Sequence, residues 1–297
     1  KIKQIFEYKK SWLKVFDKKI FWLPYFNHPD PSVKRKSGFL TPTYTIDDNL
    51  GFWVNVPYFK VLSKDKDMTF NPRLYANDHI ILQSEYRQAF KSGNLISDFS
   101  YNYDGRNSNT HLFANYDGRN VDKDFGYNIQ IQNISNDQYI KKHNLSNTSP
   151  LITTGSNLES FMNIKKEFEE ENSELVSSIR VYENLSGRDD DRFTYVFPDF
   201  TFKKNIEIDD DYNGNFGFSS SGYQKNYATN IYETSLTHNF NFDSFSTIWS
   251  NGLSSSYSFA FTNNNKYLDD PTHGRIDYDY TSTDLFGTFV FGTSYPL

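Results

Sequence analysis

Apolar and polar side chains alternate along most of the chain after residue 40. Between Phe125 and Gln132, every odd position is apolar and every even position is a glycine or an amide. Because successive side chains of a strand point to opposite faces, this period of two predicts strands and not helices. The apolar faces of four such segments are Leu95, Phe99, Tyr101 and Tyr103; Phe125, Tyr127, Ile129 and Ile131; Leu236, Phe240 and Phe242; and Leu253, Tyr257, Phe259 and Phe261.

Turn-forming residues separate these alternating segments. Runs rich in Asp, Asn, Gly and Ser occur at 104–109, 186–191 and 209–215, among other places. Such residues favour tight turns, because they tolerate positive φ or close the turn with their side chains. The spacing of the turns predicts about eleven to thirteen antiparallel strands of roughly ten residues, joined as a meander. Residues 135–150 differ and predict a short helix or a long loop.

Two all-β architectures fit this pattern. A soluble β-sandwich buries its apolar faces between two sheets, and its strands usually have about five or six residues. A transmembrane barrel turns its apolar face to lipid and its polar face to a wet lumen, with strands of about 9–11 residues. The chain is 18% aromatic, yet its mean hydropathy is −0.71. Long strands with Ser, Asn and Gln opposite aromatic residues favour the barrel, with the four apolar faces toward lipid.

The sequence offers no set of residues for catalysis, a metal or a cofactor. It has no cysteine, and its six histidines lack the spacing of zinc ligands. The stretch 209–214 imitates the start of an EF-hand loop, but the twelfth position is Ser220 instead of glutamate, so a hairpin loop fits better. No P-loop, nucleophile elbow or dinucleotide motif occurs. We therefore predict a protein that is not an enzyme.

The stretch Phe21–Pro42 interrupts the alternation. Its prolines fix φ and remove backbone donors, so a strand that begins near Ile20 must end here. Residues 1–40 hold ten Lys and Arg against three Asp and Glu, whereas the remainder holds 21 against 34. Without a nucleic-acid-binding signature, this basic start predicts a solvated face and no nucleic-acid partner. The stretch predicts a boundary between a first unit, residues 1–38, and a barrel, residues 39–297.

The junction and the segments after it closely resemble the LPS-assembly protein family of the Gram-negative outer membrane (LptD, also OstA/Imp). The family shows a Pro-Tyr-aromatic in its first barrel strand, here Pro57–Phe59. It shows D-x-T-x-x-P in the second, here Asp67–Pro72, and E-[YF]-R in the third, here Glu85–Arg87. The stretch 134–145 is similar to a further family segment, V-S-D-[DS]-x-Y, with Asn136 in place of an Asp.

This resemblance implies a fold and a function. Residues 1–38 would be the last strands of a periplasmic β-jellyroll, and residues 39–297 the first part of an outer-membrane barrel of about two dozen strands. Because the sequence opens at Lys1 within an apparent strand, we expect a piece of a longer protein whose barrel is incomplete. Such proteins pass lipopolysaccharide through the jellyroll and release it into the outer leaflet through a lateral gate. The implied partners are lipopolysaccharide, outer-membrane lipid, an LptE-type plug lipoprotein and an LptA-type periplasmic bridge protein.

Two groups of residues are the candidate site. Pro57 and Pro72 each remove a ladder donor from strands that the resemblance places first and second in the barrel, next to the seam that must open. Prolines that merely mark strand ends are the other interpretation. The predicted junction residues are Pro24, His28, Pro29, Asp30, Pro31, Lys34, Arg35, Lys36, Ser37 and Gly38. Of these, we expect Lys34, Arg35 and Lys36 at the periplasmic rim, near the anionic headgroups of the lipid.

Two other functional classes remain open from the sequence. A porin-like solute channel would share the barrel architecture, but it has no need of a rigid basic junction that leads from a periplasmic domain. A secreted carbohydrate-binding β-sandwich would bury the aromatic faces between two sheets.

Overall fold

The computed structural model describes the whole chain except residues 1–4, 16–17, 30–34, 48–49, 77–78, 104–106, 121, 123, 146–150, 152–155, 187–191, 207–212, 228–229, 271–277 and 295–297. Two strands, β1 (Ile5–Val15) and β2 (Lys18–Pro29), form an antiparallel hairpin sheet of their own. The large sheet begins at Gly38. The predicted boundary at residue 38 falls at the first residue of the large sheet, and the assignment of two domains stays a prediction.

The large sheet contains 17 strands within the described residues. The first are short: β3 (Gly38–Phe39), β4 (Thr43–Asp47), β5 (Gly51–Asn55) and β6 (Tyr58–Val61). Longer strands follow: β7 (Lys66–Tyr75), β8 (Ile80–Phe90), β9 (Gly93–Tyr103), β10 (Ser108–Asn120), β11 (Phe125–Ile134), β12 (Asn157–Phe168), β13 (Ser173–Asn184), β14 (Phe193–Ile206), β15 (Gly214–Tyr227), β16 (Ile231–Ser244), β18 (Ser254–Asp270) and β19 (Tyr278–Ser294). The remaining strand, β17 (Thr247–Ile248), is a two-residue segment that pairs with β18.

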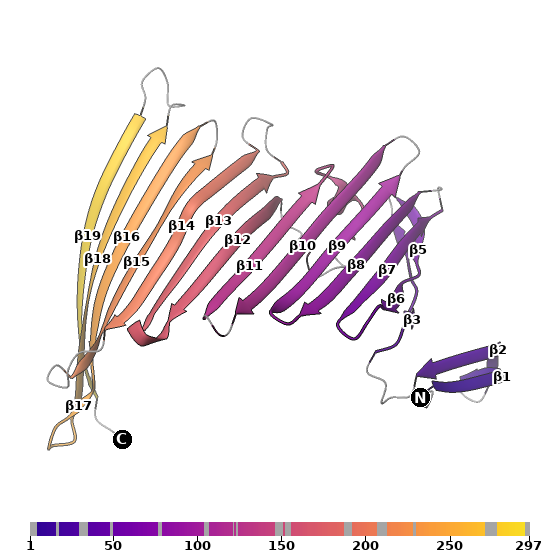
Figure 1. The fold of residues 1–297 in the computed structure, drawn as a ribbon, viewed down its shortest axis with the longest axis horizontal. Coiled ribbons are helices and arrows are strands. Elements are labelled where there is room, and N and C mark those ends of the chain that lie inside the picture. Colours follow the sequence, from indigo (N-terminus) through magenta and orange to yellow (C-terminus); the bar gives the residue numbers. More distant parts are fainter. Residues whose placement is uncertain are drawn as a thin grey trace.

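Neighbouring strands pair antiparallel in the order of the sequence. From β7 to β16 each strand pairs with the next, and β16 pairs with β18 and β18 with β19. At the other end, β5 and β6 both pair with β7, β4 pairs with β5, and β3 pairs with β6. The strands follow one another in the order of a barrel wall (Figure 1), and among the described residues no pairing register joins β19 to β3. The long antiparallel meander confirms the predicted all-β class.

The two faces of the wall differ as the alternation predicted. On the convex face of β9, Phe99 and Tyr103 are 43% and 52% exposed, whereas Ser100, which points to the concave face, is fully buried. The same convex face carries further exposed aromatic side chains on β16, β18 and β19, among them Phe240, Phe259, Phe261 and Phe289. Within the described part of the chain no second sheet covers these aromatic side chains. The exposed faces therefore favour the barrel over the β-sandwich.

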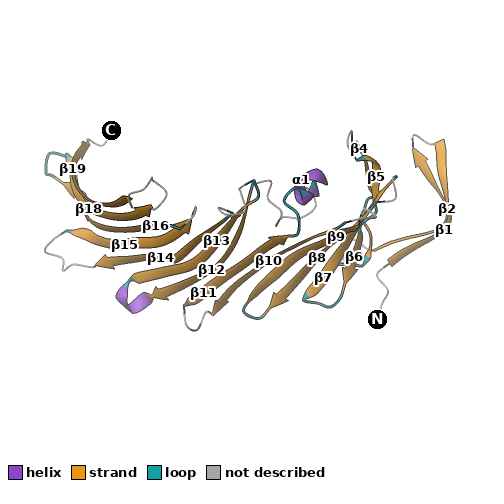
Figure 2. Ribbon diagram, turned by 90° about the horizontal axis from the view of Figure 1, so that it is seen from above, coloured by secondary structure: helices purple, strands orange, loops and turns teal. Residues whose placement is uncertain are grey.

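A small core lies on the concave face. The segment after β11 folds back over the sheet and contains the short helix α1 (Tyr139–Lys142), which Figure 2 shows above the concave side. This agrees with the short helix or long loop predicted at residues 135–150, of which 146–150 lie outside the described residues. The core joins this segment to several strands through Leu50, Tyr75, Ile81, Phe113, Ile134, Tyr139, Ile140, Leu145 and Leu158. Within the described residues, no helix is long and apolar enough to cross a membrane.

Candidate functional site

Pro57 interrupts the backbone ladder between β6 and the edge of the sheet. Gly38 opposes Phe59 in that ladder, so Leu40 opposes Pro57, and the Leu40 amide donates to the Pro57 carbonyl at 2.9 Å. In a hydrogen-bonded antiparallel pair, the two residues exchange both N–H···O bonds. Pro57 has no N–H, so the reciprocal bond to the Leu40 carbonyl cannot form.

Pro72 removes the equivalent bond from the next ladder. Asn55 opposes Arg73 and Tyr58 opposes Phe70, so the register runs unbroken past Val56 and Pro72. The Val56 amide donates to the Pro72 carbonyl at 3.4 Å, and the bond in the other direction is again missing. Two adjacent ladders therefore each lack one bond, a loss of about 1 kcal/mol per ladder.

The strand positions of these prolines differ from the prediction. The resemblance implied that Pro57 lies in the first barrel strand, but β3 and β4 pair along the outer side of the β5–β6 segment. Pro57 is thus one strand in from this edge, and Pro72, in β7, is two strands in. The pattern missed β3 and β4 because they are only 2 and 5 residues long, too short for alternation to be visible.

A buried carboxylate ties the junction to the lower end of this region. Asp67, on β7, has only 7% of its side chain exposed and forms ion pairs with Arg35 of the junction and with Arg87 of β8. The Arg87 bond measures 2.9 Å, and Arg87 also lies 3.4 Å from Glu85. Arg35 additionally donates to the Lys64 carbonyl at 2.9 Å. Asp67 therefore holds one cation on each of its oxygens, which fixes the junction against β7 and β8.

The structure brings three of the motif segments together at this point. Asp67 opens the D-x-T-x-x-P segment, while Glu85 and Arg87 belong to E-[YF]-R. Ser37 of the junction accepts a bond from the Val61 amide at 2.8 Å, just after the Pro-Tyr-aromatic segment. The sequence pattern did not predict this convergence, since Arg35 and Asp67 are 32 residues apart.

Within the described residues, no other predicted junction residue forms an ion pair with Asp67. Pro24 is exposed in the middle of β2. His28 and Pro29 end β2, and Gly38 begins β3. Lys36 is half-buried, and Asp30, Pro31 and Lys34 lie outside the described residues. Of the predicted basic triplet, Arg35 is thus engaged in an ion pair, and contact with lipid headgroups stays a prediction.

An apolar groove lies on the convex face beside Pro72. It has a volume of about 410 Å³ and is lined by Phe70, Pro72, Leu82, Gln83, Ser84 and Phe99. Phe70, Leu82 and Phe99 are each more than 40% exposed. This groove has the size and apolar chemistry to accommodate part of an acyl chain next to the weakened ladder.

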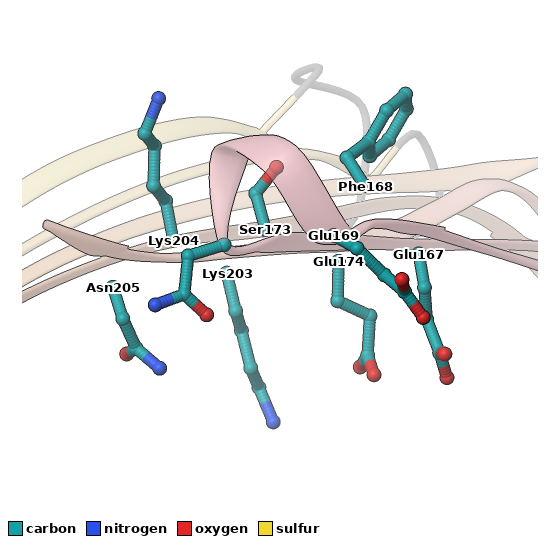
Figure 3. A pocket seen from close by; sticks show the side chains of 9 residues that line it. Glu167, Phe168, Glu169, Ser173, Glu174, Lys203, Lys204 and Asn205 are labelled. Carbon is teal, nitrogen blue, oxygen red and sulfur yellow. The ribbon is translucent and has the colours of Figure 1, made fainter. Parts of the chain in front are cut away.

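The concave face carries mixed charge. Lys165 lies 2.9 Å from Glu167 and 2.7 Å from Glu174, and Arg180 bonds Glu159 and Asp199 at 2.9 and 3.2 Å. Figure 3 shows the lower end of β13 and β14, where Glu174 and Lys203 point to one side of the sheet and Lys204 to the other. A hollow of about 360 Å³ is lined by these residues and their neighbours. The described residues contain no cluster of His, Asp and Glu that could hold a metal ion. Of the EF-hand-like stretch 209–214, residues 209–212 lie outside them.

The structure also assembles a polar cluster that the sequence pattern missed. His111 contacts the Asp98 carboxylate through Nε2 and Ser100 Oγ through Nδ1, the latter at 2.5 Å. Gln83 donates to both oxygens of Asp98 at 3.0 and 3.1 Å. Although Ser, His and Asp recur in hydrolases, none of these three side chains is more than 1% exposed. Ser100 Oγ is also bonded to Tyr139, so the cluster is a buried network and not an accessible nucleophile.

Comparison with known proteins gives consistent matches over part of the chain. No protein-family model matches. The chain is 29% identical to the LPS-assembly protein LptD of Idiomarina loihiensis over 146 residues, which is 47% of this chain and 19% of that protein. It is 27% identical to LptD of Pseudoalteromonas translucida over 132 residues, 43% of this chain and 18% of the relative. LptD of Psychrobacter arcticus is 36% identical over 98 residues, 31% of this chain and 11% of the relative. The chain thus spans about a fifth or less of these relatives, and the matches confirm the resemblance.

Proposed function

We propose that this relative of the LPS-assembly proteins forms part of an outer-membrane barrel that inserts lipopolysaccharide into the outer leaflet. The lipid leaves through the wall near β3–β7, and no covalent chemistry takes part. The observation that carries this proposal is the pair of adjacent ladders that each lack one hydrogen bond, at Pro57 and Pro72. In a lipid environment, each backbone group of a barrel needs a hydrogen-bond partner within the protein. Where two ladders lack a donor, less free energy is needed to separate the strands.

The groove on the convex face supports the same exit. A lipid that moves sideways out of a barrel must transfer its acyl chains to an apolar outer surface. Phe70, Leu82 and Phe99 provide this surface directly beside Pro72. The mixed charges of the concave face suit the opposite requirement, since they can accompany a phosphorylated sugar headgroup.

The ion pairs of Asp67 with Arg35 and Arg87 support a transfer of lipid from a periplasmic unit to the barrel. Arg35 follows the β1–β2 hairpin in the chain and is held to β7 by Asp67. We propose that residues 1–38 are the end of a periplasmic jellyroll that receives lipid from an LptA-type bridge protein. An LptE-type lipoprotein would occupy the lumen of the complete barrel. Arg35 positions the junction, which leaves Lys34 and Lys36 as the cations for headgroup phosphates.

Export of lipopolysaccharide tests the gate. In the full-length protein, Pro57→Ala and Pro72→Ala together restore two donors and should strengthen the wall by roughly 1–3 kcal/mol. If opening limits export, arrival of lipopolysaccharide at the cell surface should slow by about tenfold to a hundredfold, because 1.4 kcal/mol is a factor of ten. Pro42→Ala is the matched control, since Pro42 is exposed between β3 and β4 and lies in no strand. Normal export at normal barrel abundance would mean that the prolines only set strand geometry.

A further inference from the structure

The segment that follows β11 lies against the concave face of the first strands. Within it, Tyr139, Ile140, His143 and Leu145 are all at most 9% exposed. Figure 2 shows α1 above the concave side, where the strands near it are β9 and β10. A loop that only connected two strands would keep its apolar side chains at the surface of the protein or avoid them. This segment instead buries them against the sheet.

Its first contact is with β9 and β10. The Tyr139 hydroxyl lies 2.8 Å from Ser100 Oγ, which in turn contacts His111. The His111 ring packs edge-on against Phe113 at 5.1 Å between centroids. Burial raises the pKa of Tyr139 to about 12, so its hydroxyl is protonated at neutral pH and can donate a hydrogen bond. These contacts fix the start of the segment on the two strands.

Its second contact is with β7, next to Pro72. Arg73 donates to the His143 carbonyl, and the Tyr75 hydroxyl lies 3.2 Å from His143 Nδ1. The Arg73 guanidinium also lies 4.2 Å from the centroid of the Trp53 ring, on β5. Leu50 and Trp53 belong to the same apolar cluster as Tyr139 and Leu145. The segment therefore reaches across the sheet from β10 to the β5–β7 ladder, the ladder that lacks the Pro72 donor.

We propose that residues 139–145 are an internal staple that holds β5 and β7 to β9 and β10 and so controls the wall weakened by Pro72. This inference rests on the proposed function. The segment would hold the β5–β7 ladder closed in place of the backbone hydrogen bond that Pro72 cannot form. While it is engaged, the side chains of the segment fix Arg73 and Trp53, and the β5–β7 ladder stays closed. When it lifts, only the weakened ladder holds β5 and β6 to β7.

The composition of the staple suits reversible contact. Burial of Tyr139, Ile140 and Leu145 favours the engaged state. Arg73 opposes it, because the residue is 4% exposed and, among the described residues, its guanidinium contacts a carbonyl, a hydroxyl and an indole ring. A charge buried with neutral partners loses hydration that it regains on release. The backbone ladders of β8–β10 do not involve the segment, so it can lift while these strands stay paired.

Hydrogen exchange in the full-length protein, reconstituted in lipid nanodiscs, tests the staple. Two backbone amides report on the ladder: Val56, which donates to Pro72, and Ala76, which donates to Phe52 at 2.9 Å. In the double variant Tyr139→Ala/Leu145→Ala, peptides that contain these amides should exchange at least about tenfold faster. Peptides from β12–β14 should be unchanged. Leu112→Ala is the matched control, because Leu112 is 46% exposed on the convex face of β10 and points away from the segment.

A milder variant keeps the experiment decisive if the double variant does not fold. Tyr139→Phe retains the ring and loses only the bond to Ser100, and it should accelerate exchange of Val56 and Ala76 by about threefold. Faster exchange in 139–145 without any change at Val56 and Ala76 would overturn the proposal, as would unchanged exchange throughout. The readout involves no lipid transport. Failure of the export test with the proline variants would therefore leave this result standing, and the reverse also holds.

Discussion

The two ends of the large sheet are held together in different ways. From β12 to β19 the long strands pair along nearly their whole length, and β18 and β19 share a register of 17 residue pairs. From β3 to β7, short strands pair in pieces, two ladders lack a donor, and side-chain contacts at Asp67 and Arg73 supply the restraint. Backbone ladders give one end a uniform stability, whereas the other end depends on a few side chains. The proposed lateral exit near β3–β7 would need this difference, because one part of the sheet would open while the rest stays paired.

A proline placed in the regular end should have the largest effect. Ser221, in β15, is paired on both sides, with Thr201 and with Thr237. Because Ser221 has a paired strand on each side, Ser221→Pro removes a ladder hydrogen bond whichever strand the Ser221 N–H faces. In lipid, no water can donate to the carbonyl that loses this bond. We expect a loss on the order of 2–4 kcal/mol in the free energy of unfolding by urea in lipid vesicles. Ser221→Ala is the control. If Ser221→Pro left the free energy of unfolding unchanged, the regular end would accept a proline as the β5–β7 ladder accepts Pro72. The two ends would then not differ in this respect.

The second effect concerns the tie at Asp67. Asp67→Ala leaves Arg35 and Arg87 without their shared carboxylate, and we expect a cost of about 2–3 kcal/mol because the removed group is buried, although both arginines are partly exposed. The loss should appear as faster proteolysis after Arg35 and as a lower urea midpoint. Asp117→Ala, at an exposed carboxylate of β10, should change neither quantity. If both variants behave alike, the ion pairs do not hold the junction.

The third effect separates the two weakened ladders. Pro72→Ala alone should add about 1 kcal/mol to the β5–β7 ladder, and the new amide at residue 72 should exchange slowly because it bonds the Val56 carbonyl. Pro57→Ala should do the same for the β3–β6 ladder, with the Leu40 carbonyl as acceptor. Hydrogen exchange resolved at residues 57 and 72 measures both. A rapidly exchanging amide at either position would show that the corresponding pair is not of the hydrogen-bonded kind.

The smallest effect is in pH dependence. The pKa of Tyr139 is raised to about 12, chiefly by burial, whereas a tyrosine in an unfolded segment titrates near 10. Because the pKa of Tyr139 is higher in the folded state, the protonated hydroxyl stabilises the folded segment. This stabilisation is complete below pH 10 and is lost as the pH rises toward 12. The segment 139–145 should therefore show constant protection up to pH 10 and then open. Tyr139→Phe should remove this alkaline transition, which NMR of ring-labelled tyrosine can follow. A transition of equal size in the variant would assign it to other groups.

The sequence predicted what depends on local alternation. The parity of Phe99, Tyr101 and Tyr103 against Ser100 identified the two faces of β9, since a strand places neighbours on opposite sides whatever its partners are. The identity of the lateral neighbours was not accessible in this way. Asp98 and His111 meet because β9 and β10 pair in one particular register, and Tyr139 reaches Ser100 from 39 positions away.

One signal for the concave core was nevertheless present. Three apolar residues lie on strand faces that are otherwise polar. Each has a polar residue two positions away on the same face: Gln83 beside Ile81, His111 beside Phe113 and Gln132 beside Ile134. An apolar residue on an otherwise polar face indicates that something covers it. Three such exceptions in β8, β10 and β11 would have predicted a cover on that face, although not that residues 139–145 provide it.

The change in strand length gives the wall a sloping rim. A strand of 10 residues, as in β7, extends about 34 Å, and one of 17, as in β18 and β19, about 58 Å. At a tilt near 40° these lengths rise about 26 and 44 Å, against an apolar band of about 25 Å. On β18 and β19 the convex aromatic side chains give way to Asn263, Asn265 and Thr283, which are linked by hydrogen bonds of 2.6 and 3.0 Å. In such a barrel, β18 and β19 would extend beyond the surface of the bilayer, whereas β7 would end near it. A lipid beside β7 would therefore have no strand in front of its sugar headgroup.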